Sequence, residues 1–114
     1  MLLDFQKDVD LAAKRISPFI RKTYFTYSPE FSKFLNADVR FKMENLQVTG
    51  SFKARGAINK LLSLTKEQKQ KGVVSASTGN HGAAVAYSAQ ELDVTCSIFV
   101  PNDASEAKLQ NIKN

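Results

Sequence analysis

The apolar residues of this chain switch repeatedly between the spacing of a strand and the spacing of a helix. From Val94 to Val100 they fall at every second position, which is the period of a strand. From Ala54 to Leu62 they recur every three to four positions, which predicts a helix with one buried side. Strands that alternate with helices favour a layered α/β fold with a parallel sheet.

The same patterns predict the other elements. Pro18 ends the first helix, and Ser28-Pro29-Glu30 has the cap, proline and acid that begin the second. Residues 18–28 show no period and predict a connection. We expect helices over residues 5–16, 29–35, 54–62, 83–92 and from 105 to 114, a helix or loop over 65–71, a strand with one buried face over 39–43, and strands over 73–74 and 94–100.

Size and charge describe an ordinary globular chain. With 114 residues there is room for one small domain. Sixteen Lys and Arg against eleven Asp and Glu give a net charge of +5, but the cations are scattered among acids. The densest group, Lys66 to Lys71, is typical of a solvated helix face. We therefore expect no nucleic-acid partner.

The cysteine content and the hydropathy of the sequence exclude several further classes of protein. Cys96 is the single cysteine, so no internal disulfide can form, and no Cys and His spacing suggests a metal site. No signal-peptide pattern and no run long enough to span a membrane is present in the sequence. We expect a cytoplasmic protein with no membrane partner and no metal.

Two loops that lead into helices are rich in small polar residues, 48–53 and 75–82. Ligands of open α/β sheets gather at such places, where helix N-termini offer free N–H groups to anions. Ser77, Thr78 and Asn80 supply polar groups, and Gly79 and Gly82 let a ligand approach the backbone. The same residues also cap ordinary turns, so binding and capping both remain open.

Lys53 and His81 are the ionisable residues of these loops. Lys53 falls in the first turn of a predicted helix, where the dipole disfavours a cation and favours the neutral, nucleophilic amine. A solvated surface lysine is the ordinary alternative. His81 has no carboxylate in its loop to orient it, so a structural role is the simpler interpretation from the residues alone.

The segment Gly79–Gly82 also fits the G-x-x-G pattern of RNA-binding KH domains. In those domains the loop joins two helices, whereas here a strand is predicted before it, and neither central residue is cationic. A small basic α/β module that binds RNA or another polyanion is therefore retained as the alternative of a different class.

Together the runs Phe41–Ala57 and Ser77–Gly82 resemble the fold type II pyridoxal-phosphate enzymes, and within them the threonine/serine dehydratase and serine racemase group. The resemblance extends from Ser28 to the last residue. It implies an incomplete tryptophan synthase β-like fold, with residues 1–68 beginning a large domain and residues 69–114 beginning a small one.

The resemblance implies a role for each site residue. Lys53 would carry pyridoxal phosphate as a Schiff base, Phe52 would pack near the cofactor ring, and Asn80 would hydrogen-bond its phenolic oxygen. The implied reaction converts a small hydroxyamino acid, threonine or serine, to a 2-oxo acid and ammonia. The pocket for the substrate carboxylate would be formed by Ser77, Thr78, Gly79 and His81.

Some positions separate related subfamilies. Cysteine and threonine synthases tend to have Thr at the position of His81 and Asp at that of Ala54, so this chain favours dehydratase or racemase. Thr78 offers a hydroxyl where racemases have a serine acid or base, which makes it a second catalytic candidate and keeps serine or threonine racemase as an alternative. Thr23-Tyr24-Phe25 departs from the usual Thr-Pro-Leu.

The family grips the cofactor phosphate with consecutive glycines, and the five glycines of this sequence are never consecutive. We therefore expect the chain to be an N-terminal fragment that is inactive alone. The full-length protein is expected to be a homo-oligomer.

Overall fold

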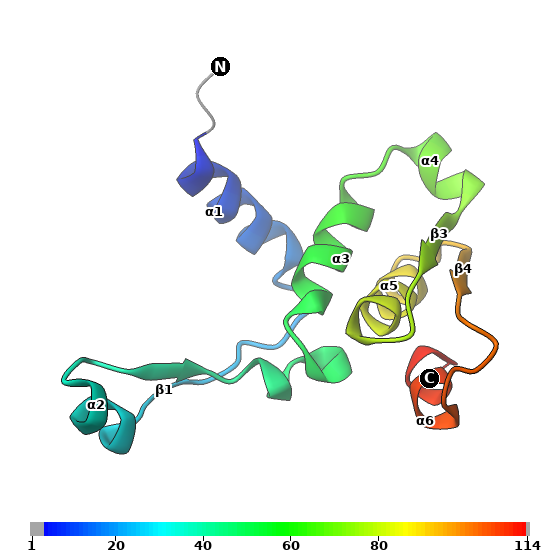
Figure 1. The fold of residues 1–114 in the computed structure, drawn as a ribbon. Coiled ribbons are helices and arrows are strands. Elements are labelled where there is room, and N and C mark those ends of the chain that lie inside the picture. Colours follow the sequence, from blue (N-terminus) through cyan, green and yellow to red (C-terminus); the bar gives the residue numbers. More distant parts are fainter. Residues whose placement is uncertain (1–3, 114) are drawn as a thin grey trace.

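The computed structural model describes residues 4–113. Figure 1 shows the arrangement of the elements. The helices are α1 (Phe5–Ile16), α2 (Pro29–Leu35), α3 (Lys53–Leu62), α4 (Lys66–Lys71), α5 (Asn80–Glu91) and α6 (Glu106–Lys113), the strands are β1 (Phe25–Tyr27), β2 (Arg40–Lys42), β3 (Val73–Ala76) and β4 (Cys96–Phe99), and the 3-10 turns are η1 (Glu44–Leu46) and η2 (Val48–Gly50).

The strands β3 and β4 pair in parallel, with Val73 opposite Cys96 and Ala76 opposite Phe99. Helix α5 connects them, as a parallel pair requires. Val73, Cys96 and Ile98 turn toward the helices and pack against the buried core. This βαβ unit confirms the predicted α/β class. The predicted strands over 73–74 and 94–100 are confirmed with shifted ends.

Helices α3 and α5 lie side by side and form the centre of the molecule (Figure 1). Their contact is made by small side chains, Ala54 and Ala57 on α3 and Ala84 with Val85 on α5. Small residues allow two helices to approach closely. As a result, the start of α3, which carries Lys53, lies near the start of α5.

The strands β1 and β2 form a separate antiparallel pair that projects with α2 away from α3 and α5 (Figure 1). Residues 18–28, predicted as a connection, thus contain a strand. The prediction that segment 39–43 has one buried face is met only in part, because Val39 and Met43 are half-buried but all three residues of β2, Phe41 included, are exposed. Phe41 meets Phe31 of α2 edge to face at 5.4 Å, yet remains 44% exposed.

The approach to Lys53 also differs from the predicted strand-to-helix loop. Two 3-10 turns, η1 and η2, separate β2 from α3. Thr49 and Gly50 both take positive φ, 61° and 71°, so the chain turns sharply before the helix. Lys53 is nevertheless the first residue of α3, as its sequence position predicted.

Helix α5 begins at Asn80, three positions before the predicted start at Ala83. Asn80, His81 and Gly82 therefore belong to its first turn instead of the preceding loop. Residues 66–71 are helical, because Thr65 and Gln68 form a reciprocal capping box. Helix α6 covers most of the predicted segment 105–114, of which residue 114 lies outside the described residues.

Within residues 4–113, no helix combines the length and the apolar character needed to cross a membrane. The described part of the chain also holds no group of three or more His, Cys, Asp or Glu placed to bind a metal ion. Cys96 is half-buried, and burial raises the pKa of its thiol.

Candidate active site

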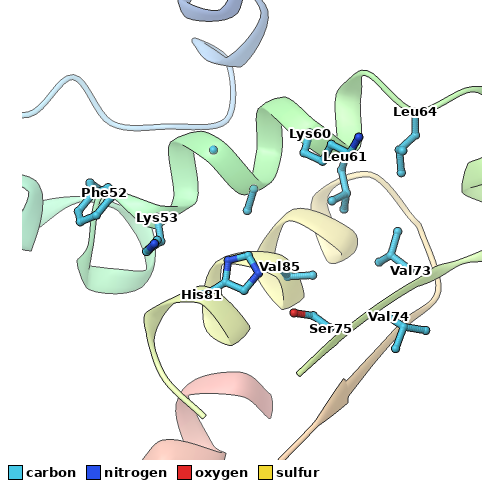
Figure 2. A pocket seen from close by; sticks show the side chains of 12 residues that line it. Phe52, Lys53, Lys60, Leu61, Leu64, Val73, Val74, Ser75, His81 and Val85 are labelled. Carbon is cyan, nitrogen blue, oxygen red and sulfur yellow. The ribbon is translucent and has the colours of Figure 1, made fainter. Parts of the chain in front are cut away.

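Lys53 stands at the edge of a cavity of ≈ 530 Å³ between α3, α5 and β3. Its Nζ lies 5.3 Å from the centroid of the Phe52 ring, within the range of a cation–π contact. Figure 2 shows Lys53 on α3 and His81 on α5 directed toward the same open space. Both side chains are exposed, so a ligand can reach them.

The rest of the cavity is largely apolar. Gly56 lies one turn along α3, and a Cβ added there would meet no atom within 4 Å. Ser75 adds a hydroxyl from β3. The remaining lining residues are Ala57, Lys60, Leu61, Leu64, Val73, Val74 and Val85. A cavity with apolar walls and a few polar groups is what a small aromatic ligand requires.

The loop before α5 is held by its backbone. The N–H of Ser77 donates to the Phe99 carbonyl at 3.1 Å, which extends the β3–β4 pairing by one residue. The N–H of Gly79 then donates to Ser77 Oγ at 3.2 Å. A Cβ on Gly82 would lie 2.6 Å from the Ser77 carbonyl oxygen, so the loop folds against the helix start only because residue 82 is glycine.

This arrangement leaves the first N–H groups of α5 without helical acceptors. The N-terminal N–H groups of any helix lack partners within the helix, and together with the dipole they attract anions. Asn80 and His81, in that first turn, are exposed, and Ser77 and Thr78 are half-buried. The start of α5 can therefore receive a carboxylate or a phosphate.

The predicted site residues thus fall into two adjacent groups. Phe52, Lys53 and His81 line the cavity. The others, Ser77, Thr78, Gly79 and Asn80, lie in the loop and helix start beside it and do not line it. The Ser77 hydroxyl accepts from the N–H of Gly79 within the loop and still has a proton that it can donate to a ligand.

Sequence reasoning gave no role to a polar network behind Lys53. Arg55 donates to Glu44 through Nε at 2.8 Å and through Nη2 at 2.7 Å, and Thr23 donates to the same carboxylate at 2.6 Å. The Gln47 side chain, 2% exposed, exchanges two hydrogen bonds with the backbone of Arg21. No periodic spacing joins these residues, so only the folded chain reveals the network.

The network has an electrostatic signature. The hydrogen bonds from Arg55 lower the pKa of the Glu44 carboxyl from 4.5 to about 2, with Thr23 contributing and burial opposing the shift. Reciprocally, Glu44 raises the pKa of Arg55. The Glu44 side chain is 15% exposed, so solvent screens the pair less than a surface ion pair.

This pair predicts an acid-sensitive stability. Because the pKa of Glu44 is lowered on folding, its stabilisation is complete above about pH 4.5 and is lost as the pH falls toward about 2. The free energy of unfolding should therefore drop over this interval by about 2 kcal/mol more in the unmodified chain than in Glu44→Gln, a discounted value since Arg55 is 33% exposed.

Urea unfolding across this pH range measures the difference. Asp38→Asn is the matched control, because Asp38 also holds an arginine, Arg40, but its side chain is 63% exposed. That variant should leave the acid dependence nearly unchanged. If the free energy of unfolding fell equally with pH in the unmodified chain and in Glu44→Gln, the prediction would be contradicted.

The sequence profile of a known family, described as pyridoxal-phosphate dependent enzyme, matches residues 16–114. The chain belongs to this pyridoxal-phosphate-dependent family. The resemblance predicted from the two motifs is confirmed, and the predicted cofactor is that of the family.

Individual relatives agree. The serine racemase of Dictyostelium discoideum is 44% identical over 106 residues, which cover 93% of this chain and 33% of that protein. A catabolic L-threonine dehydratase of Staphylococcus aureus is 45% identical over 107 residues, covering 93% and 31%. The chain thus spans about a third of the length of these relatives.

Solved structures show the same fold. The crystal structure of the Dictyostelium serine racemase superposes with a TM-score of 0.89 at 44% identity, over 94% of this chain and 35% of that one. A threonine deaminase from Solanum lycopersicum gives 0.85 at 31% identity, over 96% and 30%. The predicted α/β architecture of this family is thereby confirmed.

Proposed function

We propose that this chain provides the cofactor-bearing lysine and the substrate-carboxylate loop of a pyridoxal-phosphate-dependent lyase. The lyase would convert threonine or serine to a 2-oxo acid and ammonia. The observation that carries the proposal is the position of Lys53, at a helix start and at the edge of a cavity, beside the anion-attracting start of α5. Membership of the family adds independent support.

The residues present fit the cofactor. Lys53 offers an accessible primary amine, the cavity of ≈ 530 Å³ has the size and apolar walls of a small-ligand site, and Phe52 stands beside the amine. When bound, pyridoxal phosphate supplies an aldehyde to the amine and a ring that withdraws electrons from the substrate α-carbon.

The proposed roles are those that the resemblance to the family implies. Lys53 would hold the cofactor covalently, and its free amine would accept the α-proton of the substrate. Phe52 would pack near the cofactor ring, and Asn80 would hydrogen-bond its phenolic oxygen.

Substrate orientation is assigned to the loop before α5. The N–H groups of the first turn and the hydroxyls of Ser77 and Thr78 donate hydrogen bonds to the substrate carboxylate. Gly79 allows the carboxylate to approach the backbone. His81 bounds the carboxylate pocket on the side that faces the cavity. Holding the carboxylate here fixes the α-carbon relative to Lys53.

A racemase is the second candidate. Thr78 supplies a hydroxyl near the start of α5, where an acid or base on the opposite face of the substrate from Lys53 would be needed. The 44% identical relative named as serine racemase favours keeping this candidate. Measuring the D-enantiomer beside the 2-oxo acid separates the two activities.

The whole protein is proposed to be a cytoplasmic homo-oligomer acting on a small hydroxyamino acid. Residues 1–68 are proposed to begin its large domain and residues 69–114 its small domain. The dividing position lies within α4, so the helix would continue across it. An RNA-binding module receives no support from the loop geometry, because Gly79–Gly82 joins β3 to α5 and does not join two helices.

A chimera tests the proposed function. Replacing the matching third of the Dictyostelium serine racemase with this chain should give an enzyme that forms 2-oxo acid from serine or threonine. The parent racemase and a chimera carrying Lys53→Ala are the controls. A chimera that folds and binds pyridoxal phosphate but forms neither 2-oxo acid nor D-amino acid would contradict the proposal.

The chain by itself should behave differently. Purified with pyridoxal phosphate and threonine or serine, the 114-residue chain is expected to bind the cofactor weakly and to form little or no 2-oxo acid. The reason is that its glycines offer no consecutive run to hold the cofactor phosphate. Robust 2-oxo acid formation that disappears in Lys53→Ala would show that the chain suffices alone.

A further inference from the structure

Lys53 and Arg55 are the two cations of the first turn of α3. Successive helical residues are turned by about 100°, so two residues apart means nearly opposite sides. Lys53 lines the cavity shared with α5 (Figure 2), whereas Arg55 lines a different hollow beside α1. A contact that fixes the side toward which Arg55 points therefore also fixes the side toward which Lys53 points.

The contact that holds Arg55 resists rotation. Two parallel hydrogen bonds, 2.7 and 2.8 Å long, join its guanidinium to Glu44. Such a planar fork specifies both the position and the angle of its partner, which a single contact does not. Thr23 donates to the same carboxylate at 2.6 Å and orients it further.

Glu44 is itself anchored independently of α3. It lies in η1, and three residues later the buried Gln47 binds the backbone N–H and carbonyl of Arg21 at 2.8 and 2.9 Å. Arg21 in turn donates from its side chain to the Leu46 carbonyl at 3.1 Å. The carboxylate is thus attached to a segment that has its own hydrogen bonds to Arg21, outside α3.

Within the first turn of α3, Ala54 is the one residue buried in the core. Phe52, at the N-cap, makes no side-chain hydrogen bond, and the first turn contains no acidic residue. Ala54 and Ala57 are buried against Ala84 and Val85 of α5, so they hold the helix close to α5 but provide no polar contact that orients the first turn. Glu44 is the anion that meets this turn from outside, where a negative charge is favourable.

We propose that Glu44 and Arg55 are positioning residues that hold the amine of Lys53 toward the cavity. This inference rests on the proposed function of Lys53. The pair touches neither the cavity nor the amine, and it acts by setting the rotation of the first turn of α3.

Reductive labelling of lysines tests the proposal on the full chain. The amine nitrogen bonds to the aldehyde carbon of pyridoxal phosphate with loss of water, and borohydride then reduces the new C=N bond to a stable amine. Peptide mass spectrometry gives the labelling rate of each lysine. Lys60 lines the same cavity and is the internal reference.

The variant Arg55→Met should lower the labelling rate of Lys53 relative to Lys60 by about tenfold, since small misplacements of a reacting group have large effects. Arg40→Met is the matched control, because Arg40 also makes two bonds to a carboxylate but lies in the projecting β2. Arg40→Met should leave the labelling rate of Lys53 relative to Lys60 unchanged. Arg55→Lys keeps the charge without the fork and should restore the rate only in part.

Three results would overturn the proposal. Unchanged Lys53 labelling in Arg55→Met would show that the pair has no positioning role. A parallel fall at Lys53 and Lys60 would show a general structural defect. If Arg55→Met does not fold, Glu44→Gln replaces it, and full labelling of Lys53 there would have the same meaning. Failure of the proposed function looks different: in the unmodified chain, Lys53 would label no faster than Lys60.

Discussion

Lys53→Ala is expected to abolish the fast covalent attachment of pyridoxal phosphate at position 53, leaving only the slower labelling of other lysines such as Lys60, and to abolish all 2-oxo acid formation by the chimera. The variant removes the amine at the cavity edge, and the other cavity lysine, Lys60, stands two turns further along α3. The loss of turnover should exceed about a thousandfold, because no other group at the site can form the covalent bond and also accept the α-proton. Mass spectrometry after borohydride reduction and a 2-oxo acid assay measure the two losses.

The fold should not change in this variant. Lys53 is exposed, and among the described residues its side chain makes a contact with the Phe52 ring but no hydrogen bond or ion pair, so the free energy of unfolding should stay within about 0.5 kcal/mol. Lys60→Ala is the matched control and should retain labelling at Lys53. Total attachment in Lys53→Ala that stays at the level of the unmodified chain, or turnover that survives, would show that another residue carries the cofactor.

Gly82→Ala should destabilise the chain by about 2 kcal/mol and displace the loop of residues 77–79. The added Cβ would lie 2.6 Å from the Ser77 carbonyl oxygen, and backbone atoms cannot move aside as a flexible side chain can. The hydrogen bonds of Ser77 to Phe99 and of Gly79 to Ser77 would be strained. Urea unfolding and faster hydrogen exchange at these amides measure the effect.

Gly56→Ala provides a control with the same chemical change. Gly56 also lies in a helix, α3, but its added Cβ would meet no atom within 4 Å. Alanine is the better helix former, so this variant should be neutral or more stable by up to about 1 kcal/mol. If the two variants had equal stability, the close approach at Gly82 would not be what shapes the loop.

Local patterns anticipated much of the fold. The helical spacing from Ala54 to Leu62 and the alternation from Val94 to Val100 each report on one element, and both elements are present. The exact ends of the helices and strands were harder to predict. Helix α5 begins at Asn80, within what looked like a polar loop, since a helix start and a loop use the same small polar residues.

The pairing of strands that are distant in the sequence could not be predicted from local patterns. Residues 18–28 have no period, yet Phe25–Tyr27 form a strand, because Arg40–Lys42 supply its antiparallel partner. Alternation in segment 39–43 suggested a buried face, but burial depends on what covers a strand. Within residues 4–113 this strand is left exposed.

The sequence by itself determined to which family the chain belongs, and it gave the residues that we propose to carry the chemistry. Lys53 at a helix start and the small polar segment Ser77–Gly82 are both properties of short stretches of chain, and the two motifs together identified the family that the profile over residues 16–114 shows. Such motifs can be recognised in the sequence because their residues lie close together along the chain.

Only the tertiary structure decided how these stretches meet. The packing of α3 on α5 places Lys53 and His81 at one cavity, and it separates them from Ser77, Thr78, Gly79 and Asn80 beside it. The Glu44–Arg55 pair behind Lys53 likewise exists only in the folded chain. Side-chain contacts between segments follow from packing in space, which no local spacing encodes.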